Sequence, residues 1–211
     1  MSVGQNARPN FPVKRNKIMF SNSNSGQLAK RPGDICAEAI SGPDWLIRDL
    51  RSDVAGEVGA VAIYQGILAV SRDPSVRVFA QNHLRSERRH LQLVSTLLGR
   101  EQRTLLTPVW RLAGFLTGAL PSLFSANAIF HTICAVETFV DTHYQRQIDR
   151  LRTEALHPEV LGILESCRTD EVKHRDEAKD LSGAAAGFFT KIWTFNVDLG
   201  SRVAVMLARR I

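Results

Sequence analysis

From Trp45 onward, hydrophobic residues recur every three or four positions, which is the spacing of one buried face of an α-helix. Four such stripes are present, and each includes either one glutamate or one Glu-x-x-His pair among its apolar members. The pattern predicts four helices that carry acidic or imidazole groups on their buried faces. The stripes are Leu50, Val54, Glu57, Val61, Tyr64, Leu68; Val76, Ala80, His83, Glu87, His90, Val94, Leu97; Phe130, Ile133, Glu137, Val140, Tyr144, Ile148, Leu151; and Val160, Leu164, Cys167, Glu171, His174, Ala178, Leu181.

Two breaks divide these helices into two pairs. Asp73-Pro74 separates the first helix from the second, and His157-Pro158 begins the fourth helix after the third. Both connections are short, so each pair should be an antiparallel hairpin. The glutamate and the Glu-x-x-His pair of each hairpin lie at similar distances from its turn, which places them at one level. The expected fold is all-α, a ferritin-like four-helix bundle built from two antiparallel hairpins.

Four inward carboxylates require a compensating charge. An unpaired buried carboxylate is costly, whereas coordination to a cation removes the penalty. Two Glu-x-x-His pairs, each facing one further glutamate, are the ligand pattern of ferritin-like di-iron and di-manganese proteins. The alternative, a solvated charged face, is disfavoured because the neighbours on each stripe are Val, Ile and Leu. The predicted metal ligands are Glu57, Glu87, His90, Glu137, Glu171 and His174.

The ligand chemistry narrows the choice of metal. Oxygen and imidazole ligands without thiolate favour iron or manganese over copper(I) or structural zinc. Four carboxylates balance two divalent ions, so the reduced centre would be neutral and tolerable in a bundle core. Two irons that can each give an electron to bound O2 would make the centre competent for oxygen activation or ferroxidation.

Further polar residues lie one or two turns from the predicted ligands. Asp53 and Asp141 each lie one turn from a ligand glutamate, and Asp170 adjoins Glu171. Such carboxylates commonly accept a hydrogen bond from a metal-bound histidine, although each could equally be a solvated surface aspartate. Tyr144 is expected to be a core residue, with a redox or hydrogen-bonding role beside the metals as the alternative.

The cysteines and remaining histidines are assigned no chemistry. Cys36, Cys134 and Cys167 form no CxxC pair and are odd in number, which argues against a disulfide framework and for a reducing compartment. Cys134 and Cys167 are expected to fill the core, and His83 to be a hydrogen-bonded core histidine. His131 lies off its stripe and receives no role.

The N-terminal segment differs from the rest in composition. The first 33 residues contain no acidic residue and are rich in Ser, Asn and Gly, which predicts a disordered basic arm over residues 1–44 before a single domain at 45–211. A mitochondrial transit peptide is the alternative, but Gly and Pro interrupt the segment. It has no apolar stretch of the secretory kind. The net charge of +6 could suit nucleic acid, an anionic membrane surface or an acidic partner protein. No nucleic-acid-recognition motif is present in the sequence, so nucleic-acid binding is not expected.

A run without formal charge extends over residues 112–136. Its length is that of a transmembrane helix, but Gly114, Gly118 and Pro121 interrupt it, and its end must enter the bundle to deliver Glu137. An interfacial or re-entrant hairpin is therefore expected.

A second apolar stretch, residues 184–208, is broken by Lys191, Asp198 and Arg202 and predicts an amphipathic closing helix. Together with the positive charge, the two stretches predict a monotopic protein that draws a lipid-soluble substrate from the bilayer. The alternative is an ordinary core plus a protein interface.

The chain resembles the demethoxyubiquinone hydroxylases of ubiquinone biosynthesis over about residues 45–211. The matching segments are Asp53-Val54-Ala55-Gly56-Glu57, Ile63-Tyr64, Glu87-Arg88-Arg89-His90, Leu106-Thr107-Pro108-Val109-Trp110, Gly114 to Gly118, Val136-Glu137, His143-Tyr144, Asp170-Glu171 with His174-Arg175-Asp176, and Ala208 to Ile211. His143-Tyr144 falls where the family has a conspicuous His-Tyr pair.

The resemblance implies a monooxygenase with two iron ions per chain, cycling between Fe2+ and Fe3+. It would use O2 to hydroxylate the ring of a polyprenylated demethoxyquinol, with electrons ultimately from NADH. The family also implies a peripheral membrane protein, often with a lipid-binding accessory protein. A homo-oligomer is a separate expectation. The expected location is the cytoplasmic face of the bacterial inner membrane, with the matrix face of the mitochondrial inner membrane as the alternative.

One departure from the family concerns Val54. The family typically reads Asp-His-Ala-Gly-Glu where this chain has Val54, so a polar contact near Glu57 is lost. All six predicted ligands are present, so the departure bears on substrate choice more than on metal binding.

Two rival functions remain. A ferroxidase of the same fold would need a soluble, cage-forming exterior, against which the run at 112–136 argues. A non-catalytic, membrane-bound accessory protein of quinone biosynthesis would keep the site as a relic, against which the intact ligands on all four helices argue.

Overall fold

The computed structural model describes residues 40–183 and 185–211. Nearly all of the predicted arm, residues 1–44, lies outside this part of the chain. The described residues form six α-helices and one short 3-10 turn, with no strand among them. The elements are α1 (Asp44–Val70), α2 (Pro74–Ser95), η1 (Arg100–Gln102), α3 (Thr107–Ser122), α4 (Ala126–Glu154), α5 (Pro158–Leu181) and α6 (Phe188–Ala208). The all-α prediction is confirmed.

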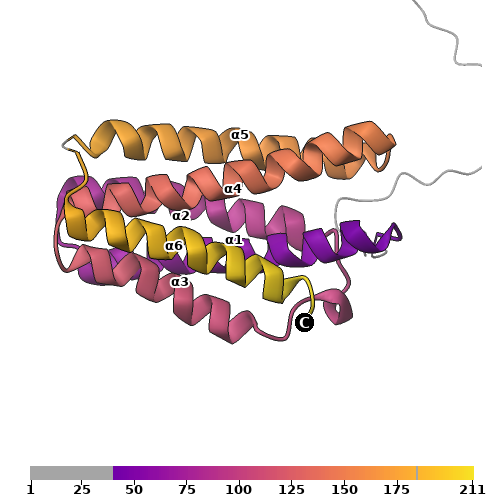
Figure 1. Ribbon diagram of the computed structural model, residues 1–211, viewed down its shortest axis with the longest axis horizontal. Helices are drawn as coiled ribbons and strands as arrows, with labels where there is room; N and C mark the ends of the chain where they lie inside the picture. Colours follow the sequence, from indigo (N-terminus) through magenta and orange to yellow (C-terminus); the bar gives the residue numbers. More distant parts are fainter. Residues whose placement is uncertain (1–39, 184) are drawn as a thin grey trace, which may run out of the picture. The chain divides into compact units, whose positions relative to one another are not determined.

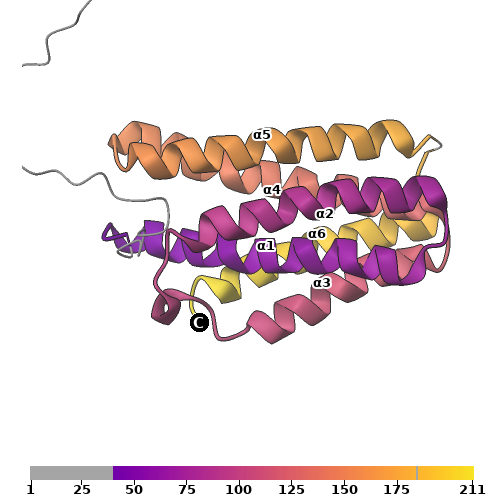
Figure 2. The ribbon, with the colours of Figure 1, turned by 180° about the vertical axis from the view of Figure 1, so that it is seen from behind.

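The two predicted hairpins are formed by α1 with α2 and by α4 with α5 (Figures 1 and 2). Asp73 caps α2, because its carboxylate accepts hydrogen bonds from the backbone N–H groups of Ser75, at 2.8 Å, and Val76, at 3.3 Å. The second hairpin turns through Ala155 and His157, whose φ angles of 50° and 45° are left-handed. Pro158 then occupies the first turn of α5, where its missing N–H costs nothing.

Helices α3 and α6 are added to the side of the bundle formed by α1 and α4. Helix α3 packs mainly against α1, and α6 packs against α4 and α1, so that α6 lies in front in Figure 1 and behind in Figure 2. The charge-free run at 112–136 forms the end of α3, a tight turn and the start of α4. The predicted closing helix is α6.

Glycines allow α1 and α3 to approach backbone to backbone. A Cβ added at Gly114 would overlap the carbonyl oxygen of Gly59, and one added at Gly118 would overlap that of Ile63. A Cβ added at Gly66 would in turn overlap the carbonyl oxygen of Phe115. The close fit holds α3 against α1 along most of its length.

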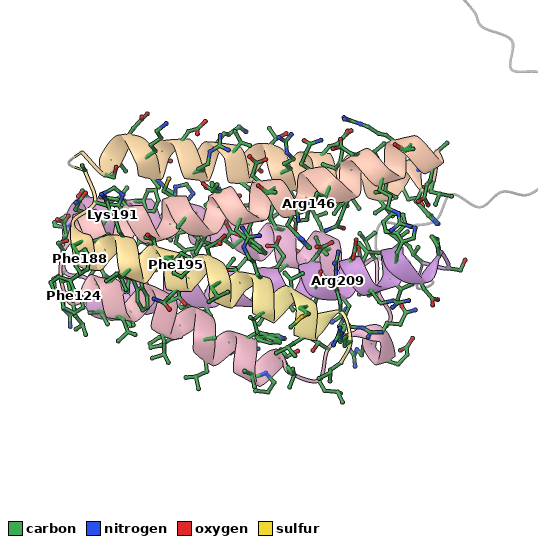
Figure 3. All side chains as sticks on the ribbon, viewed as in Figure 1. Phe124, Arg146, Phe188, Lys191, Phe195 and Arg209 are labelled. Atoms are coloured by element: carbon green, nitrogen blue, oxygen red, sulfur yellow. The ribbon has the colours of Figure 1, made fainter. Side chains whose placement is uncertain are left out.

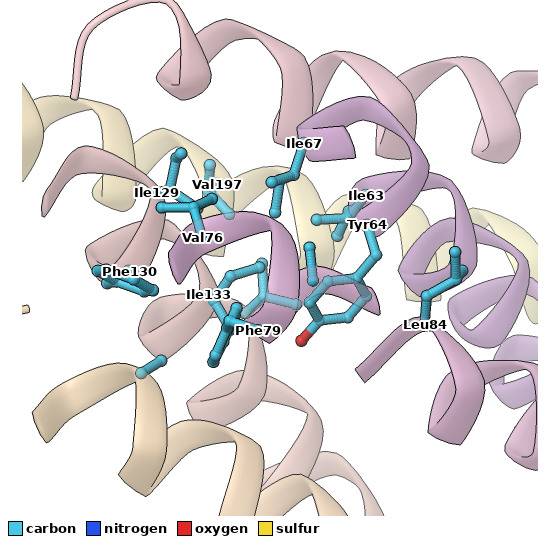
Figure 4. Packing of buried hydrophobic residues seen from close by; sticks show 13 residues of the cluster. Ile63, Tyr64, Ile67, Val76, Phe79, Leu84, Ile129, Phe130, Ile133 and Val197 are labelled. Carbon is cyan, nitrogen blue, oxygen red and sulfur yellow. The ribbon is translucent and has the colours of Figure 1, made fainter. Parts of the chain in front are cut away.

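Most buried apolar residues of the bundle form two clusters, one on each side of the level at which the predicted ligands lie. A third, smaller cluster joins α1 to α3 and α6. One cluster includes Ile67, Phe79 and Ile133 and is shown in Figure 4. The other includes Leu50, Leu164 and their neighbours near the opposite ends of the helices. On every helix of the two hairpins, the predicted ligands fall between the residues of these two clusters. The polar groups are therefore enclosed on both sides by packed hydrocarbon.

One described helix, α1, is long and apolar enough to cross a membrane by length and composition. Half of its most apolar window is buried against the rest of the bundle. The buried core helix of a bundle can have the same length and apolar composition as a membrane-spanning helix, and α1 is such a core helix here.

Candidate metal centre

The six predicted ligands lie together at the middle of the bundle. They form two groups, and within each group one ligand atom from every member lies within 4.8 Å of the others. Glu87 and Glu171 belong to both groups, as bridging carboxylates would. Every member is at most 6% exposed. The groups are Glu57, Glu87, His90 and Glu171, and Glu87, Glu137, Glu171 and His174.

The centre leaves several buried atoms without hydrogen-bond partners. Glu57 Oε2, Glu87 Oε1, both carboxylate oxygens of Glu171, and the Nδ1 atoms of His90 and His174 are all in this position. Buried polar atoms are nearly always satisfied, so such a concentration requires an explanation. The atoms converge on one region and are the oxygen and imidazole types that iron and manganese prefer. The residues present therefore fit a pair of such ions.

Each imidazole approaches a carboxylate from the other hairpin. His90 Nδ1 lies 2.9 Å from Glu171 Oε1, and His174 Nδ1 lies 3.0 Å from Glu87 Oε1. Although the distances are short, neither nitrogen has the directional geometry of a hydrogen bond. The nitrogens and oxygens thus point towards shared space between the helices.

The electrostatics of the centre are those of a site for positive charge. Burial alone would lower the pKa of His90, but the contacts with Glu171 and Glu87 outweigh it and raise that pKa to about 11. The same opposing effects raise the pKa of His174 to about 9. Burial tends to raise the pKa of Glu171, but His174 and His90 outweigh it and lower that pKa to about 2. In the absence of metal, protons on the imidazoles supply the charge that the carboxylates require.

Glu57 and Glu137, the two glutamates that belong to only one ligand group, have raised pKa values. Burial, followed by the charges of Glu87 and Glu171, raises the pKa of Glu57 well above its ordinary value. Burial and the same two neighbours also raise the pKa of Glu137. The neutral forms of Glu57 and Glu137 are therefore favoured unless a cation lies beside them.

Both tyrosines of the chain donate to ligand glutamates, and they do so crosswise. The Tyr144 hydroxyl donates to Glu57 Oε1 at 2.5 Å, and the Tyr64 hydroxyl donates to Glu137 Oε1 at 3.0 Å. Each tyrosine follows the glutamate of its own helix by two turns and reaches the glutamate of the other hairpin. Tyr144 was predicted as a candidate, whereas Tyr64 received no role. Tyr64 follows Glu57 by the same two turns by which Tyr144 follows Glu137, and this shared spacing could have identified Tyr64.

Of the three candidate aspartates, one lies against a predicted ligand histidine. Asp170 Oδ2 is 3.3 Å from His90 Nε2, the ring nitrogen that faces away from the carboxylates. Asp141 instead forms ion pairs with Arg168, at 2.7 Å, and Arg175, at 2.6 Å. Asp141 therefore ties α4 to α5 through these ion pairs, away from the centre.

Asp53 belongs to a separate buried network. Its Oδ1 atom accepts a hydrogen bond from Gln147 at 2.7 Å and lies 3.0 Å from His143 Nε2. His143 also lies 3.2 Å from the Ser52 hydroxyl. The candidates Asp53 and His143 thus contact each other, one helical turn from Glu57 and beside Tyr144.

His83 is buried beside His174, as expected of a core histidine. Its Nε2 atom lies 3.1 Å from Glu177, and its ring meets that of His174 edge-on with centroids 4.1 Å apart. Burial and then the proximity of His174 lower the pKa of His83 to about 3. His83 is therefore neutral at ordinary pH and closes one side of the His174 ring.

Val54 is buried in the same apolar cluster as Tyr144 and Cys167. A hydrocarbon side chain stands there, where the resembling family has histidine. Its effect on substrate choice remains a prediction.

Two adjoining cavities lead to the centre. A small cavity of about 40 Å³ is lined by Glu57, Glu87, Glu137 and Glu171. A larger one, about 310 Å³, lies among α1, α3, α4 and α6 and is lined mostly by apolar and small side chains, Trp110 among them. They share six lining residues, which are Ser52, Gly56, Ala60, Phe139, Val140 and Val205. An apolar molecule in the larger cavity would therefore lie next to the carboxylates.

Comparison with known proteins identifies the family and relatives of this chain. The family described as ubiquinone biosynthesis protein COQ7 matches residues 44–208. A 3-demethoxyubiquinol 3-hydroxylase of Rhodospirillum rubrum is 34% identical over 183 residues, covering 85% of this chain and 82% of the relative. The human mitochondrial NADPH-dependent 3-demethoxyubiquinone 3-hydroxylase is 32% identical over 168 residues, covering 78% and 77%. Since the family match spans the whole bundle and the relatives align over most of their length, this chain belongs to the COQ7 family of ubiquinone biosynthesis proteins.

Proposed function

We propose that this chain is a di-iron monooxygenase that hydroxylates the ring of a polyprenylated demethoxyquinol in ubiquinone biosynthesis. The observation that carries the proposal is the buried set of six candidate ligand residues from four helices, five of which have side-chain atoms without a hydrogen-bond partner. The reaction is inferred from the relatives, which are 3-demethoxyubiquinol and 3-demethoxyubiquinone 3-hydroxylases. In the overall balance, one O2, two electrons and two protons convert a ring C–H into C–OH and release one water.

Each half of the centre would hold one iron. Glu57 and His90 would bind the first ion, Glu137 and His174 would bind the second, and Glu87 and Glu171 would lie between them. The bound pair would supply the redox chemistry and the binding of O2. The protein's own part is to hold the ligands at fixed depth, and to restrain Glu57 and Glu137 through the two tyrosine hydroxyls.

The apolar cavity is the proposed place for the substrate. Its lining residues, including Ile63 and Trp110, exclude water and suit a quinol ring with the beginning of its prenyl tail. Gly56 and Ala60 have small side chains at the junction with the metal cavity, so a ring can approach the carboxylates there. This apolar cavity favours an organic substrate over the rival ferroxidase function.

The membrane is the proposed source of the substrate. Large apolar side chains are exposed along α3 and α6, and Figure 3 shows Phe124 and Phe188 together at one end of these helices. Phe124 is 81% exposed and Phe189 is 83% exposed. A patch of this kind marks a membrane or protein interface. We assign it to peripheral binding at the cytoplasmic face of a bacterial inner membrane, or the matrix face of the mitochondrial one.

A lipid-binding accessory protein and a second copy of the chain are further proposed partners of the same apolar face. The electrons are proposed to come ultimately from a reduced nicotinamide nucleotide. The sequence resemblance implied NADH, whereas the names of the mitochondrial relatives specify NADPH. Either donor satisfies the two-electron balance.

The proposal is tested by reconstituting the purified chain anaerobically with ferrous iron and measuring iron per chain. A demethoxyquinol in detergent micelles and ¹⁸O2 are then added, and the product is analysed by mass spectrometry. We expect two irons and one labelled oxygen in the product. Glu137→Ala should keep about one iron per chain and form no product, whereas Glu165→Ala, which changes a surface ion pair with Arg152, should keep two irons and form product. Iron binding that is unaffected by Glu137→Ala would overturn the di-iron assignment.

A further inference from the structure

The apolar cavity among α1, α3, α4 and α6 contains polar side chains whose hydrogen-bond donors are mostly used within the protein. The hydroxyls of Ser52, Thr117 and Ser201 donate to backbone carbonyls of their own helices, at 2.7, 2.9 and 2.9 Å. An N–H of Asn196 does the same at 2.8 Å. Among the described residues that line the cavity, those with polar side-chain atoms are Ser52, Trp110, Thr117, Trp193, Asn196 and Ser201.

The two tryptophans of this cavity differ in what their indole N–H groups bind. Trp193 Nε1 donates to the Thr132 hydroxyl at 2.9 Å. Trp110 Nε1 is buried without a hydrogen-bond partner, and the residue as a whole is only 8% exposed. Buried N–H groups are nearly always satisfied. A buried donor that is left open in the lining of a cavity therefore indicates an acceptor that comes from outside the chain.

Trp110 lies at the end of the cavity that adjoins the metal centre. Its side chain packs in one cluster with Ala55 of α1 and Ala208 at the end of α6. Ala55 directly precedes Gly56, which lines both the apolar cavity and the small cavity beside the carboxylates. The ligand candidate Glu57 is the next residue. An atom bound to the Trp110 indole would thus lie at the level of the carboxylates along α1.

The close contact between α3 and α1 fixes the position of this indole. Gly114, one turn after Trp110, fits against the carbonyl oxygen of Gly59. The carbonyl oxygen of Trp110 itself would lie 3.9 Å from a Cβ added at Gly59. Because the donor is carried by two tightly packed helices, little ordering is needed when a ligand binds it.

An indole N–H can only donate, so it selects a ligand atom that accepts. The ring of a demethoxyquinol has hydroxyl and methoxy oxygens that can accept, whereas a prenyl tail has no acceptor. Hydrophobic contact is non-directional and does not fix which end of such a molecule enters an apolar cavity first. A single placed donor at the inner end fixes this orientation.

We propose that the Trp110 Nε1–H donates a hydrogen bond to a ring oxygen of the bound substrate and so holds the ring, not the prenyl tail, beside the metal centre. The inference rests on the proposed function, which places the substrate in the apolar cavity. The hydrogen bond would also limit rotation of the ring. The C–H bond to be hydroxylated then stays next to the junction at Gly56.

The test compares a ligand that has ring oxygens with one that has none. The iron-loaded full chain, in its diferric form and at a fixed detergent concentration, is titrated by calorimetry with a demethoxyquinone that has a short prenyl tail. The second ligand is a toluene with the same prenyl tail. We expect the wild type to prefer the quinone. Trp110→Phe should reduce this preference roughly fivefold, as loss of one neutral hydrogen bond does.

Trp193→Phe is the matched control, because the Trp193 N–H is already bound by Thr132. It should change the affinity for both ligands by the same factor. A second variant replaces Trp110 with benzothienylalanine, in which sulfur stands in place of the indole N–H, and so keeps the size of the ring system. This variant should lose the preference as Trp110→Phe does. Iron per chain and thermal denaturation check that each variant is folded.

Turnover gives a second measurement. In Trp110→Phe, the fraction of consumed O2 that appears in the product should fall, because the ring is no longer held in one orientation. An unchanged preference in both Trp110 variants would overturn the proposal, as would an equal loss of preference in Trp193→Phe. Hydroxylation by the wild type would in either case leave the proposed function standing. A preference that depends on Trp110, without any hydroxylation by the wild type, would support the Trp110 contact and remove the monooxygenase assignment.

Discussion

The two hairpins supply the same ligand types to the centre but surround them differently. On the His90 side, the outer ring nitrogen faces the carboxylate of Asp170, which Arg89 and Lys173 also contact. On the His174 side, the ring instead meets the edge of neutral His83. A carboxylate on the outer nitrogen raises the basicity of an imidazole ligand. We therefore predict two unequal metal positions, with the one at His90 binding its ion more tightly.

The largest expected effect comes from removing a carboxylate that both halves have in common. Glu171→Gln should abolish tight binding of both ions, because Glu171 belongs to both ligand groups. Glu137→Gln affects the His174 half alone and should leave about one iron per chain, since ligand count governs retention. Iron analysis after desalting measures the difference. Equal losses in the two variants would show that the halves are not separable.

A smaller effect is expected from the aspartate that distinguishes the halves. Asp170→Asn should weaken the tighter of two successive metal-binding steps by roughly 10- to 100-fold, as loss of such a partner typically does. Anaerobic titration with Co2+, followed by absorption, resolves the two steps. Asp141→Asn is the control, since Asp141 pairs with arginines away from the centre. If Asp170→Asn weakened the second step instead, the assignment of the tighter position to His90 would be reversed.

The smallest effect is expected from the crossed tyrosines. Tyr144→Phe and Tyr64→Phe each remove one hydrogen bond to a ligand glutamate, at a cost of about 1 kcal/mol in the free energy of unfolding. Tyr144→Phe should perturb the half with Glu57, and Tyr64→Phe the half with Glu137. Thermal denaturation with and without metal, together with the spectrum of the Co2+-loaded protein, checks both statements. Identical spectral changes in the two variants would contradict the crossed arrangement.

Features that depend on helical spacing were predictable from the sequence. The three- and four-residue steps placed all six ligand candidates on buried faces, and the Pro74 and Pro158 breaks set the hairpins. The rise per residue of a helix is constant, so the distance of a residue from the turn can be compared between the two helices of a hairpin. The domain boundary near residue 45 stays a prediction, because the arm lies outside the described residues.

Features that depend on how helices are rotated against each other were not predictable. Asp141 and Asp170 both looked like partners for a ligand histidine, yet Asp141 turns towards Arg168 and Arg175. A pocket of about 730 Å³ likewise draws its lining residues from α1, α4, α6 and the C-terminal segment, which are far apart along the chain. Periodicity gives the buried face of a helix but not which neighbour that face meets.

The crossed tyrosines give the protein a built-in reporter. The chain contains two tyrosines, and both hydroxyls bind glutamates of the centre. Isotopic labelling of tyrosine would therefore give an NMR spectrum with one resonance for each half and no background from the rest of the chain. Paramagnetic broadening of the two signals during metal addition would show the order in which the halves fill, without any mutation.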